Sequence, residues 1–417
     1  MANEIDTAIQ LVVYDDGLDG LSPLTDLRPA FDVRTGAGTT LQRLLMEAGR
    51  DRPDAVFVPE RLRDLAGEAH PGTAVNELPE GEEILLVSAR WLMPAGLCSM
   101  VGNSALTDGA SGHVLAMRAE RAHAESLLAN GAVPRGIANR TVDSPALLGF
   151  PWDVIRHRDA CLLHDLGLIA RRIPFETESV GVTMVNAEDV FIHQGATVLP
   201  SVSLDASAGP IVIDEGATVR LGASIIGPAY VGAGSTALDH ALIKSNTAIG
   251  PRCKVAGEVG GTIIQGYSNK AHDGHIGDSW IGEWVNLGAG TINSNLLNTY
   301  GEVTATLGGE HHRTGLTFLG TIAGDHVKTA ICTRLMTGGV LRSGAMVAST
   351  APPPSETPAF AWLTDQSAQR FRIEKFLDVM RTVMGRREVT PSDAYVARVR
   401  ELYKLSGASG ASGASGE

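Results

Sequence analysis

The 417-residue sequence is poor in aromatic residues and in cysteines. Aromatic side chains make up only 5% of the chain, whereas glycine occurs 48 times. A narrow solenoid interior favours Val and Ile over rings and needs glycine at its corners, so this composition favours a solenoid. The four cysteines lie far apart and form no CxxC pair: Cys98, Cys161, Cys253 and Cys332. They are predicted to be reduced, buried small residues of a cytoplasmic protein.

Positive charge and long apolar runs are also scarce. The formal net charge is −13, which argues against general nucleic-acid binding, so a phosphorylated small molecule would need a local group of Lys or Arg. No stretch of about 18 apolar residues occurs, and no basic segment followed by an apolar run stands at the N-terminus. The sequence therefore predicts no membrane partner and a cytoplasmic location.

Aliphatic or small residues recur at a strict six-residue interval in the middle of the chain. Eight positions keep this interval: Ile213, Val219, Ile225, Val231, Ala237, Ile243, Ile249 and Val255. Ile192, Val198 and Leu204 keep it before a shift of three residues. Neither a helix nor an ordinary strand has a period of six, whereas a hexapeptide repeat does, because each repeat is one short strand and one tight corner. We therefore expect a parallel β-helix with these residues pointing inward.

The repeat divides the chain into four expected parts. Residues 1–170 should form an α/β domain with a helical linker, with strands at 10–14, 55–58 and 84–87 and helices at 40–47, 113–128 and 151–168. Residues 171–350 should form the β-helix, interrupted by an insert at 293–315. Residues 351–404 should form a C-terminal helical segment, and 405–417 a flexible tail that looks like a linker or tag.

The densest polar stretch lies within the repeat region. Residues 268–275 read SNKAHDGH and residues 284–291 read WVNLGAGT. Residues one coil apart stack on a solenoid, so these two segments can share one surface. His272 is a candidate general base, because an imidazole can accept a proton from an amine or hydroxyl near neutral pH. The spacing alone also allows His272 to be an ordinary corner residue at the surface.

Residues 269–295, NKAHDGHIGDSWIGEWVNLGAGTINSN, resemble the acetyltransferase half of the bifunctional enzyme family that makes UDP-N-acetylglucosamine. The resemblance implies a left-handed parallel β-helix, a homotrimer and acetyl-CoA as acyl donor to an amino-sugar phosphate. It places His272 on the catalytic base, His275 on a ligand-contacting tyrosine and Asn286 on a substrate-contacting asparagine. Backbone N–H groups of residues 284–290 are expected to stabilise the oxyanion of the reaction.

The chain is more similar still to an alternative bacterial form of this family, with a sugar nucleotidyltransferase-like N-terminal domain. The motifs that carry the resemblance are PLT at 23–25, RP at 28–29, FDVR at 31–34, YSNK at 267–270, NTYG at 298–301, TG at 314–315 and GDHVKT at 324–329. The sugar-phosphate-binding Lys and Arg of the familiar enzyme align near Gly260 and Leu242. Lys244 or Lys328 is expected to supply the missing charge, and Lys270 is a further candidate for substrate binding.

Signals in the N-terminal domain are weaker. The family's nucleotide-binding loop follows the first strand, whereas the nearest string here, GAGTT, stands at 36–40 and could simply cap the helix that begins at Thr40. Arg28 and Arg34 are candidates for holding phosphates or for bracing a turn. Because strand 84–87 leads into Ser88, Ala89 and Arg90, no Asp stands there as an obvious magnesium ligand. The domain is either a reduced transferase, which would use Mg²⁺, or an inactive remnant.

Trimeric left-handed β-helices also occur among carbonic anhydrases, which hold zinc with three histidines. His272 with His275, and His311 with His312, offer nitrogens, but their spacing does not match that family, and no metal is predicted. The leading interpretation is a sugar-phosphate N-acetyltransferase paired with a nucleotidyltransferase that can be degenerate. The alternative is a non-catalytic trimeric scaffold with an N-terminal domain that senses a sugar nucleotide.

Overall fold

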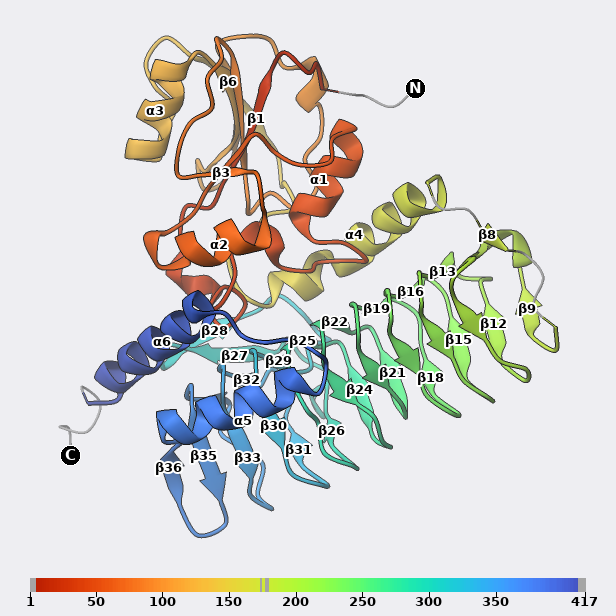
Figure 1. Cartoon of the computed structure of the whole chain (residues 1–417). Coiled ribbons are helices and arrows are strands. Elements are labelled where there is room, and N and C mark those ends of the chain that lie inside the picture. The colour runs from red at the N-terminus through yellow and green to blue at the C-terminus, as the bar shows by residue number, and fades with distance from the viewer. Residues whose placement is uncertain (1–4, 173–174, 177–179, 412–417) are drawn as a thin grey trace. The chain divides into compact units, whose positions relative to one another are not determined.

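The structure is a computed structural model that describes residues 5–172, 175–176 and 180–411. It divides into two compact units (Figure 1). Unit 1 consists of Met1–Leu21, Leu27–Val33 and Gly38–Asp153, and unit 2 consists of Ser22–Asp26, Arg34–Ala37 and Val154–Glu417. Among the described residues, no helix is both long enough and apolar enough to cross a membrane.

Unit 1 is an α/β domain built on a mixed seven-stranded sheet with the order β3-β2-β1-β4-β6-β5-β7. Its strands are β1 (Gln10–Tyr14), β2 (Ala55–Phe57), β3 (Ala74–Val75), β4 (Ile84–Ser88), β5 (Ser104–Asp108), β6 (Val114–Ala119) and β7 (Ala138–Val142). Its helices are α1 (Thr40–Ala48), α2 (Arg63–Ala69) and α3 (Arg121–Asn130). β1 pairs in parallel with β2 and β4 and is almost wholly buried, as expected for a parallel strand covered on both faces.

The prediction of a helix over residues 113–128 is wrong for the first half of that range. Residues Val114–Ala119 form strand β6, which pairs antiparallel with both β4 and β5, and only Arg121–Asn130 is helical. The Ala- and Met-containing strand is buried on both faces between two neighbours, so tertiary pairing overrides the helical preference of its residues.

Unit 2 is a parallel β-helix whose coils stack one above the next (Figure 1). The strands of its first face are β8 (Phe175–Glu176), β10 (Val190–His193), β13 (Ile211–Ile213), β16 (Ala229–Val231), β19 (Thr247–Ile249), β22 (Ile263–Gly266), β25 (Trp280–Glu283), β29 (Ile322–Ala323), β32 (Val340–Leu341) and β34 (Glu356–Thr357). The strands of the second, called here the pocket face, are β11 (Thr197–Val198), β14 (Thr218–Val219), β17 (Thr236–Ala237), β20 (Lys254–Val255), β23 (Asn269–Lys270), β30 (Lys328–Thr329), β33 (Met346–Ala348), β35 (Ala361–Thr364) and β36 (Ala368–Arg370). The strands of the third are β9 (Thr183–Val185), β12 (Ser203–Asp205), β15 (Ser224–Ile226), β18 (Leu242–Ile243), β21 (Glu258–Gly260), β24 (His275–Gly277), β26 (Ile292–Asn293) and β31 (Arg334–Leu335).

The six-residue repeat fills the interior of this β-helix, so the expected fold class is confirmed. On the first face, Ile213, Val231 and Ile249 stand in register on successive coils, and all are fully buried. The pocket face continues its inward column from Val219 through Ala237 and Val255. Each face therefore contributes one column of aliphatic side chains to a continuous core.

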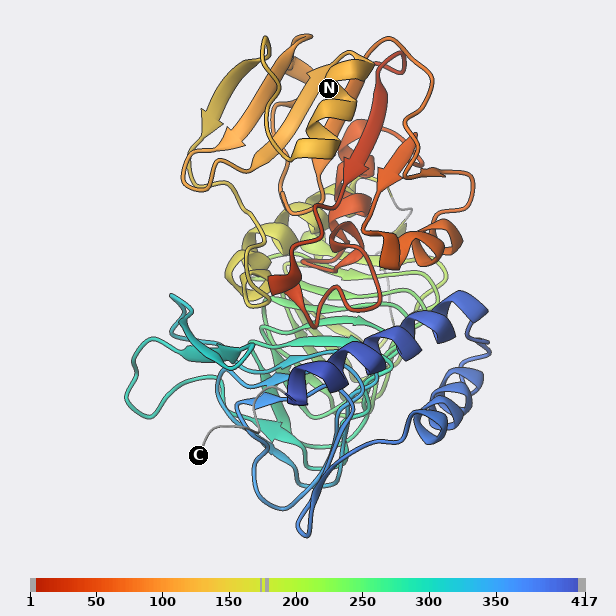
Figure 2. The same cartoon turned by 90° about the vertical axis from the view of Figure 1, so that its left-hand side faces the viewer.

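The β-helix continues past its expected end at residue 350. Strands β34 and β35 come after the triple proline and pair in parallel with β32 and β33, so they add to the coil. The expected insert contains an antiparallel hairpin of β27 (Thr304–Leu307) and β28 (Glu310–Arg313). The teal segment in Figure 2 shows this insert standing away from the coils.

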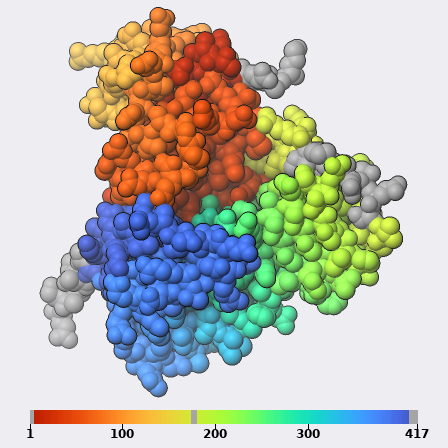
Figure 3. All heavy atoms as spheres, in the orientation of Figure 1, coloured from red at the N-terminus to blue at the C-terminus, as the bar shows by residue number. Residues whose placement is uncertain are grey.

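One helix precedes the β-helix in the sequence, and two helices follow it. α4 (Asp153–Ala170) confirms the expected helix before it, and α5 (Ile373–Gly385) and α6 (Asp393–Ala411) form the expected C-terminal segment. α6 extends into the repeat of Gly, Ala and Ser that was expected to be a flexible tail, and residues 412–417 lie outside the described part of the chain. In the space-filling view, the blue surface of these helices is continuous with that of the last coils (Figure 3).

α5 packs against a column of rings at one corner of the β-helix. Tyr267, Trp284 and His326 occupy this corner on successive coils, each with a positive φ. Their rings form a stack, with centroids 4.5 Å apart for Tyr267 and Trp284 and 6.3 Å apart for Trp284 and His326. Phe376 of α5 meets the edge of His326 at 5.8 Å, and Tyr395 of α6 contacts Nε2 of His326 through its hydroxyl at 2.8 Å. These contacts fix the C-terminal helices beside the pocket face.

Candidate functional site

His272 lies on an enlarged corner of the coil. The corner between β23 and β24 consists of residues 271–274, whereas two residues, Ala256 and Gly257, separate β20 from β21 one coil earlier. His272 is exposed as a result. Gly257 makes room for the enlarged corner, because a Cβ atom there would lie 3.0 Å from the carbonyl oxygen of His272 and 2.8 Å from that of Gly274. Its φ of +68° also favours glycine.

Lys270 holds this corner from inside the coil. It stands in register with Val255, so it continues the inward column of the pocket face and is only 3% exposed. Its Nζ donates to the carbonyl oxygens of Ala256 (3.2 Å), Asp273 (3.1 Å) and His272. An ammonium has three donors, so these bonds use its full capacity. Burial lowers the pKa of Lys270 to about 8, partly offset by the charge of Asp273. Lys270 therefore holds the His272 corner in place, and all three of its donors are engaged there.

A ladder of outward-pointing polar residues runs along the pocket face beside this corner. Lys254 pairs in register with Asn269, Asn269 with Asn286, and Asn286 with Lys328. Successive strands are about 4.8 Å apart, so the four side chains form one line across four coils. Asn286 is exposed and Lys328 is half-buried.

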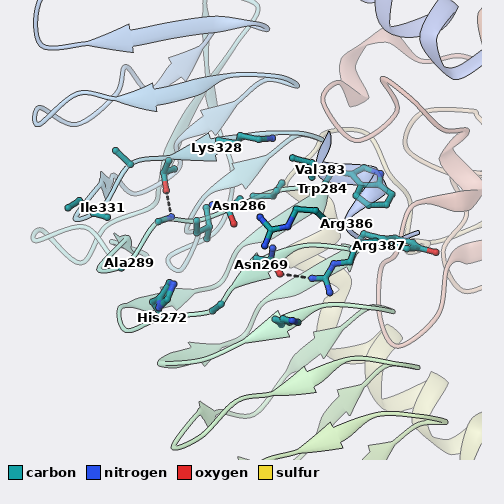
Figure 4. A pocket seen from close by; sticks show the side chains of 18 residues that line it. Asn269, His272, Trp284, Asn286, Ala289, Lys328, Ile331, Val383, Arg386 and Arg387 are labelled. Carbon is teal, nitrogen blue, oxygen red and sulfur yellow. Dashed lines mark hydrogen bonds between the residues drawn. The ribbon is translucent and has the colours of Figure 1, made fainter. Parts of the chain in front are cut away.

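The C-terminal end of α5 lies over this ladder and closes a pocket. The pocket has a volume of about 720 Å³ and combines the His272 corner, the ladder, the segment 284–289, the segment 328–331 and three residues of the C-terminal segment, Val383, Arg386 and Arg387. Figure 4 shows His272, Asn286, Lys328 and Arg386 around this hollow. Arg387 is held in place by its Nη2, which donates to Oδ1 of Asn269 at 2.6 Å. We call this hollow the α5 pocket.

The α5 pocket is positively charged, in a chain with a net charge of −13. Four cationic side chains line it, Lys254, Lys328, Arg386 and Arg387, and none of its 18 lining residues is Asp or Glu. Burial lowers the pKa of Lys328 to about 8. This concentration of cations is what a phosphorylated small molecule would require.

The residues predicted from the sequence to form one substrate site lie in two different places in the structure. The structure brings His272, Asn286 and Lys328 together in the α5 pocket. His275 and Lys244 instead lie on the third face, where both contact Oε1 of Glu258, at 3.4 Å and 3.2 Å. Neither lines the α5 pocket, because the corner at 271–274 turns the chain from one face to the next.

Five of the seven backbone N–H groups expected to stabilise an oxyanion, in residues 284–290, are used by the fold. Those of Asn286, Leu287 and Gly290 donate to carbonyl oxygens of neighbouring coils. Those of Val285 and Gly288 donate to the hydroxyls of Ser268 (2.9 Å) and Thr329 (3.0 Å). Bonds to neighbouring coils thus occupy these five N–H groups, and the predicted oxyanion contact is restricted to the N–H groups of Trp284 and Ala289, which line the pocket.

The two arginines predicted for the nucleotide are both buried, 7% exposed for Arg28 and 6% for Arg34. Arg34 belongs to unit 2, where its backbone N–H donates to Oε1 of Gln265 at 2.7 Å and its carbonyl accepts from Nε1 of Trp280 at 3.1 Å. Its guanidinium donates to the carbonyl oxygens of Gln265 and Ala37. Arg34 therefore braces the chain in the way that the sequence allows as the alternative to phosphate binding.

The string GAGTT likewise has a structural role. Thr39 caps α1 in a capping box: its hydroxyl accepts from the backbone N–H of Gln42, and its own backbone N–H donates to the side chain of Gln42. This pattern satisfies two N–H groups at the start of a helix. No phosphate loop is needed to explain the string.

Sequence reasoning missed a polar cluster at the carboxyl ends of β1 and β4 in unit 1. Asp16 follows β1 and binds Arg90 through both carboxylate oxygens, at 2.7 to 3.1 Å. His113 contacts Arg90 at 2.9 Å through Nδ1 and the hydroxyl of Ser88 at 2.7 Å through Nε2. Burial, followed by the charge of Arg90, lowers the pKa of His113 to about 4. The signal was present, because carboxyl ends of parallel strands are where α/β folds bind ligands.

The carboxylates of this cluster do not offer a prepared cation site. Asp15 accepts backbone N–H groups of Gly17 (2.9 Å) and Ala30 (2.8 Å), and Asp16 is engaged by Arg90. Over the described residues, no group of three or more His, Cys, Asp or Glu side chains could hold a metal ion. We therefore derive no step through Mg²⁺.

Comparison with known proteins gives the chain a family context. Residues 11–173 match the family model described as sugar nucleotidyl transferase. The chain is 32% identical over 145 residues to the bifunctional protein GlmU of Rhodococcus jostii, covering 33% of this chain and 28% of that one. Over about a third of its length, the chain is therefore similar to GlmU-type bifunctional proteins. This confirms the resemblance stated from the sequence.

A second relative carries both activities in its name. The bifunctional sugar-1-phosphate nucleotidylyltransferase/acetyltransferase of Sulfurisphaera tokodaii is 33% identical over 132 residues, covering 31% of this chain and 33% of that one. The chain thus spans about a third of the length of the curated relatives it matches. Among solved structures, a hexapeptide transferase family protein from Anaplasma phagocytophilum is 14% identical, with 53% of this chain and 92% of that chain covered. At its TM-score of 0.19, that likeness carries no argument about function.

Proposed function

We propose that unit 2 transfers an acetyl group from acetyl-CoA to the amine of a phosphorylated amino sugar. The observation that carries this proposal is an exposed imidazole, His272, on the rim of a pocket lined by four cations and no carboxylate. A general base and an anion-binding wall are two of the groups that this reaction uses. The names of the GlmU-type relatives support the same chemistry.

Two residues of the α5 pocket have different roles in the proposed reaction, proton transfer and orientation of the substrates. Acetyl-CoA would supply the acetyl group as a thioester. His272 accepts the proton that the substrate amine loses as its nitrogen forms the new bond to the acetyl carbon and the carbon–sulfur bond breaks. The imidazolium can then return that proton to the departing thiolate, which leaves as CoA. Asn286, exposed beside His272 in the pocket, donates hydrogen bonds from its amide to orient the reacting groups.

A ligand panel tests this assignment on the whole chain. Acetyl-CoA and glucosamine-1-phosphate should each raise the thermal midpoint, because only ligands that bind the folded state stabilise it. Neutral glucosamine is the matched control for the phosphate, and it should shift the midpoint far less. If neither acetyl-CoA nor any amino-sugar phosphate moves the midpoint at millimolar concentration, the proposal is wrong.

For unit 1 a second candidate, sugar-nucleotide sensing without catalysis, has an observation in its favour. The side chains of Asp16, Arg90, His113 and Ser88 bond to one another, and the string GAGTT caps a helix. Binding of UTP or a UDP-sugar without pyrophosphate release would support the sensor. Release of pyrophosphate from UTP and a sugar-1-phosphate would support the transferase that the family match suggests.

We also propose a homotrimer. Ile331 and Leu221 lie on turns of the corner that carries His272, and they are 72% and 46% exposed. Packing of corners between copies would cover them. Light scattering should therefore give three times the chain mass of 43.8 kDa. A monomer mass at micromolar concentration would contradict this prediction.

A further inference from the structure

The charge of the α5 pocket comes from two parts of the chain far apart in sequence. Lys254 and Lys328 stand on the coil, whereas Arg386 and Arg387 follow α5. The basic residues that the family resemblance places on the third face are absent here, where Gly260 and Leu242 stand instead. The C-terminal segment thus brings positive charge to a different side of the His272 corner.

The cationic side chains of the α5 pocket differ in how many hydrogen bonds they make to the protein. Arg387 donates to Asn269, and its carbonyl oxygen accepts from Arg252 at 3.3 Å. Arg386 is exposed, and within the described chain no acceptor or carboxylate engages its guanidinium. Of the three donors of Lys328, one bonds, to the carbonyl oxygen of His326 at 3.3 Å. Arg386 and Lys328 therefore retain donors that can face a ligand.

Lys328 is a cation partly withdrawn from water without a counter-charge. Burial alone accounts for its lowered pKa, with no carboxylate contributing. Withdrawing an unpaired ammonium from water is unfavourable, and an anion bound beside it would offset that cost. A phosphoryl group is a dianion with several acceptor oxygens, which suits both an ammonium and a guanidinium.

We infer that Arg386 and Lys328 form a phosphate-binding subsite in the α5 pocket, so that the C-terminal segment is part of the substrate site. The identity of the ligand rests on the proposed acetyl transfer. Its negative charge is inferred independently, from the cations that line the pocket. Two sources have this chemistry, the phosphate of the amino sugar and the phosphates of CoA. Arg387, which donates to Asn269, lines the same pocket.

Titration calorimetry on the full chain with inorganic pyrophosphate tests the subsite directly. Arg386→Ala and Lys328→Met should each weaken pyrophosphate binding by about tenfold, the loss expected for one charge-assisted hydrogen bond. Arg381→Ala is the matched control, because Arg381 is an exposed arginine of α5 that pairs with Asp378 at 3.8 Å and lies outside the pocket. It should bind within about twofold of wild type. Equal affinity of wild type, Arg386→Ala and Lys328→Met would overturn the inference.

The pH dependence of pyrophosphate binding gives a second readout. The bound anion favours the charged ammonium, so affinity should fall as the pH rises from 7.5 to 9.5 through the pKa of Lys328, about 8. The other charged or titratable groups lining the pocket are His272, Tyr267, Lys254, Arg386 and Arg387. Lys328→Arg, which keeps its charge over this range, should flatten the profile, and an unchanged profile in that variant would count against Lys328.

Steady-state kinetics show whether the bound phosphate belongs to the sugar or to CoA. They also distinguish a failure of the proposed acetyl transfer from a failure of the phosphate-binding subsite. An Arg386→Ala variant with a raised KM for the sugar phosphate alone assigns the subsite to the sugar, and a raised KM for acetyl-CoA alone assigns it to CoA. If wild type transfers no acetyl group, the proposed function fails while the pyrophosphate titration still decides the subsite. If transfer occurs and depends on His272, but neither KM nor pyrophosphate binding changes in the variants, the subsite fails and the function stands.

Discussion

Replacing His272 with alanine should lower turnover of acetyl transfer by about 10²–10⁴-fold, the usual contribution of a general base. The fold should survive, because His272 is exposed on a corner and fills none of the interior. Binding of acetyl-CoA should change little, because a pocket of about 720 Å³ spreads its contacts over many other residues. Turnover by release of the CoA thiol and affinity by titration measure the two quantities separately.

His240→Ala is the matched control for this variant. His240 is an exposed histidine at the same corner, two coils earlier, and does not line the α5 pocket. Its substitution should leave turnover within about twofold of wild type. Full activity of His272→Ala on a substrate that wild type clearly uses would refute the assignment of the base, and His275 would become the next candidate.

Lys270→Met should also lower turnover, by at least about tenfold, although Lys270 touches no ligand. The substitution removes the donors that bind the carbonyl oxygens of Ala256, His272 and Asp273, so the corner loses its fixed geometry. Misplacement of a catalytic group by about 1 Å can cost roughly a hundredfold in rate. Because His272 remains present, kcat should fall more than the affinity for acetyl-CoA.

Stability gives a second measurement on the same variant. Unsatisfied buried carbonyls cost about 1–3 kcal/mol, but the loss of a buried ammonium relieves a desolvation cost in return. The thermal midpoint should therefore move by only a few degrees, which leaves turnover as the more sensitive measure. Lys375→Met, at an exposed position of α5, should change neither quantity. A Lys270→Met protein with wild-type kcat would contradict the positioning role.

The interior of the β-helix was predictable because it depends on a local rule. Each six-residue step places one aliphatic residue inward, and the register of Ile213, Val231 and Ile249 follows directly. Lys270 occupies the same kind of inward position as Val255, but its polarity suggested a surface residue. The three-dimensional structure is needed to show that carbonyl oxygens of an enlarged corner satisfy its ammonium.

The cationic wall of the site was not predictable from pattern. Arg386 and Arg387 stand more than a hundred residues after His272, in a segment that the sequence marked only as helical. They reach the pocket because Phe376 of α5 packs against His326 at the end of an aromatic stack. Such a contact depends on side chains of several coils at once, and no sequence period records it.

The strands of unit 1 show a similar limit. The buried strand β1 was predicted with its observed bounds, because a short apolar run beside turn residues is a strong local signal. The sequence of strand β6 predicts part of a helix, because its Ala- and Met-containing residues show no two-residue alternation. Its two antiparallel neighbours, rather than its own residues, determine its conformation.

The most direct test of the central claim is transfer of isotope-labelled acetyl from acetyl-CoA, followed by mass spectrometry of the sugar. With glucosamine-1-phosphate or another amino-sugar phosphate, the full chain should yield an N-acetylated sugar phosphate together with an equal amount of free CoA. Neutral glucosamine should be acetylated far more slowly, because it lacks the anion that the α5 pocket would bind. No labelled sugar phosphate under conditions where acetyl-CoA is bound would contradict the account.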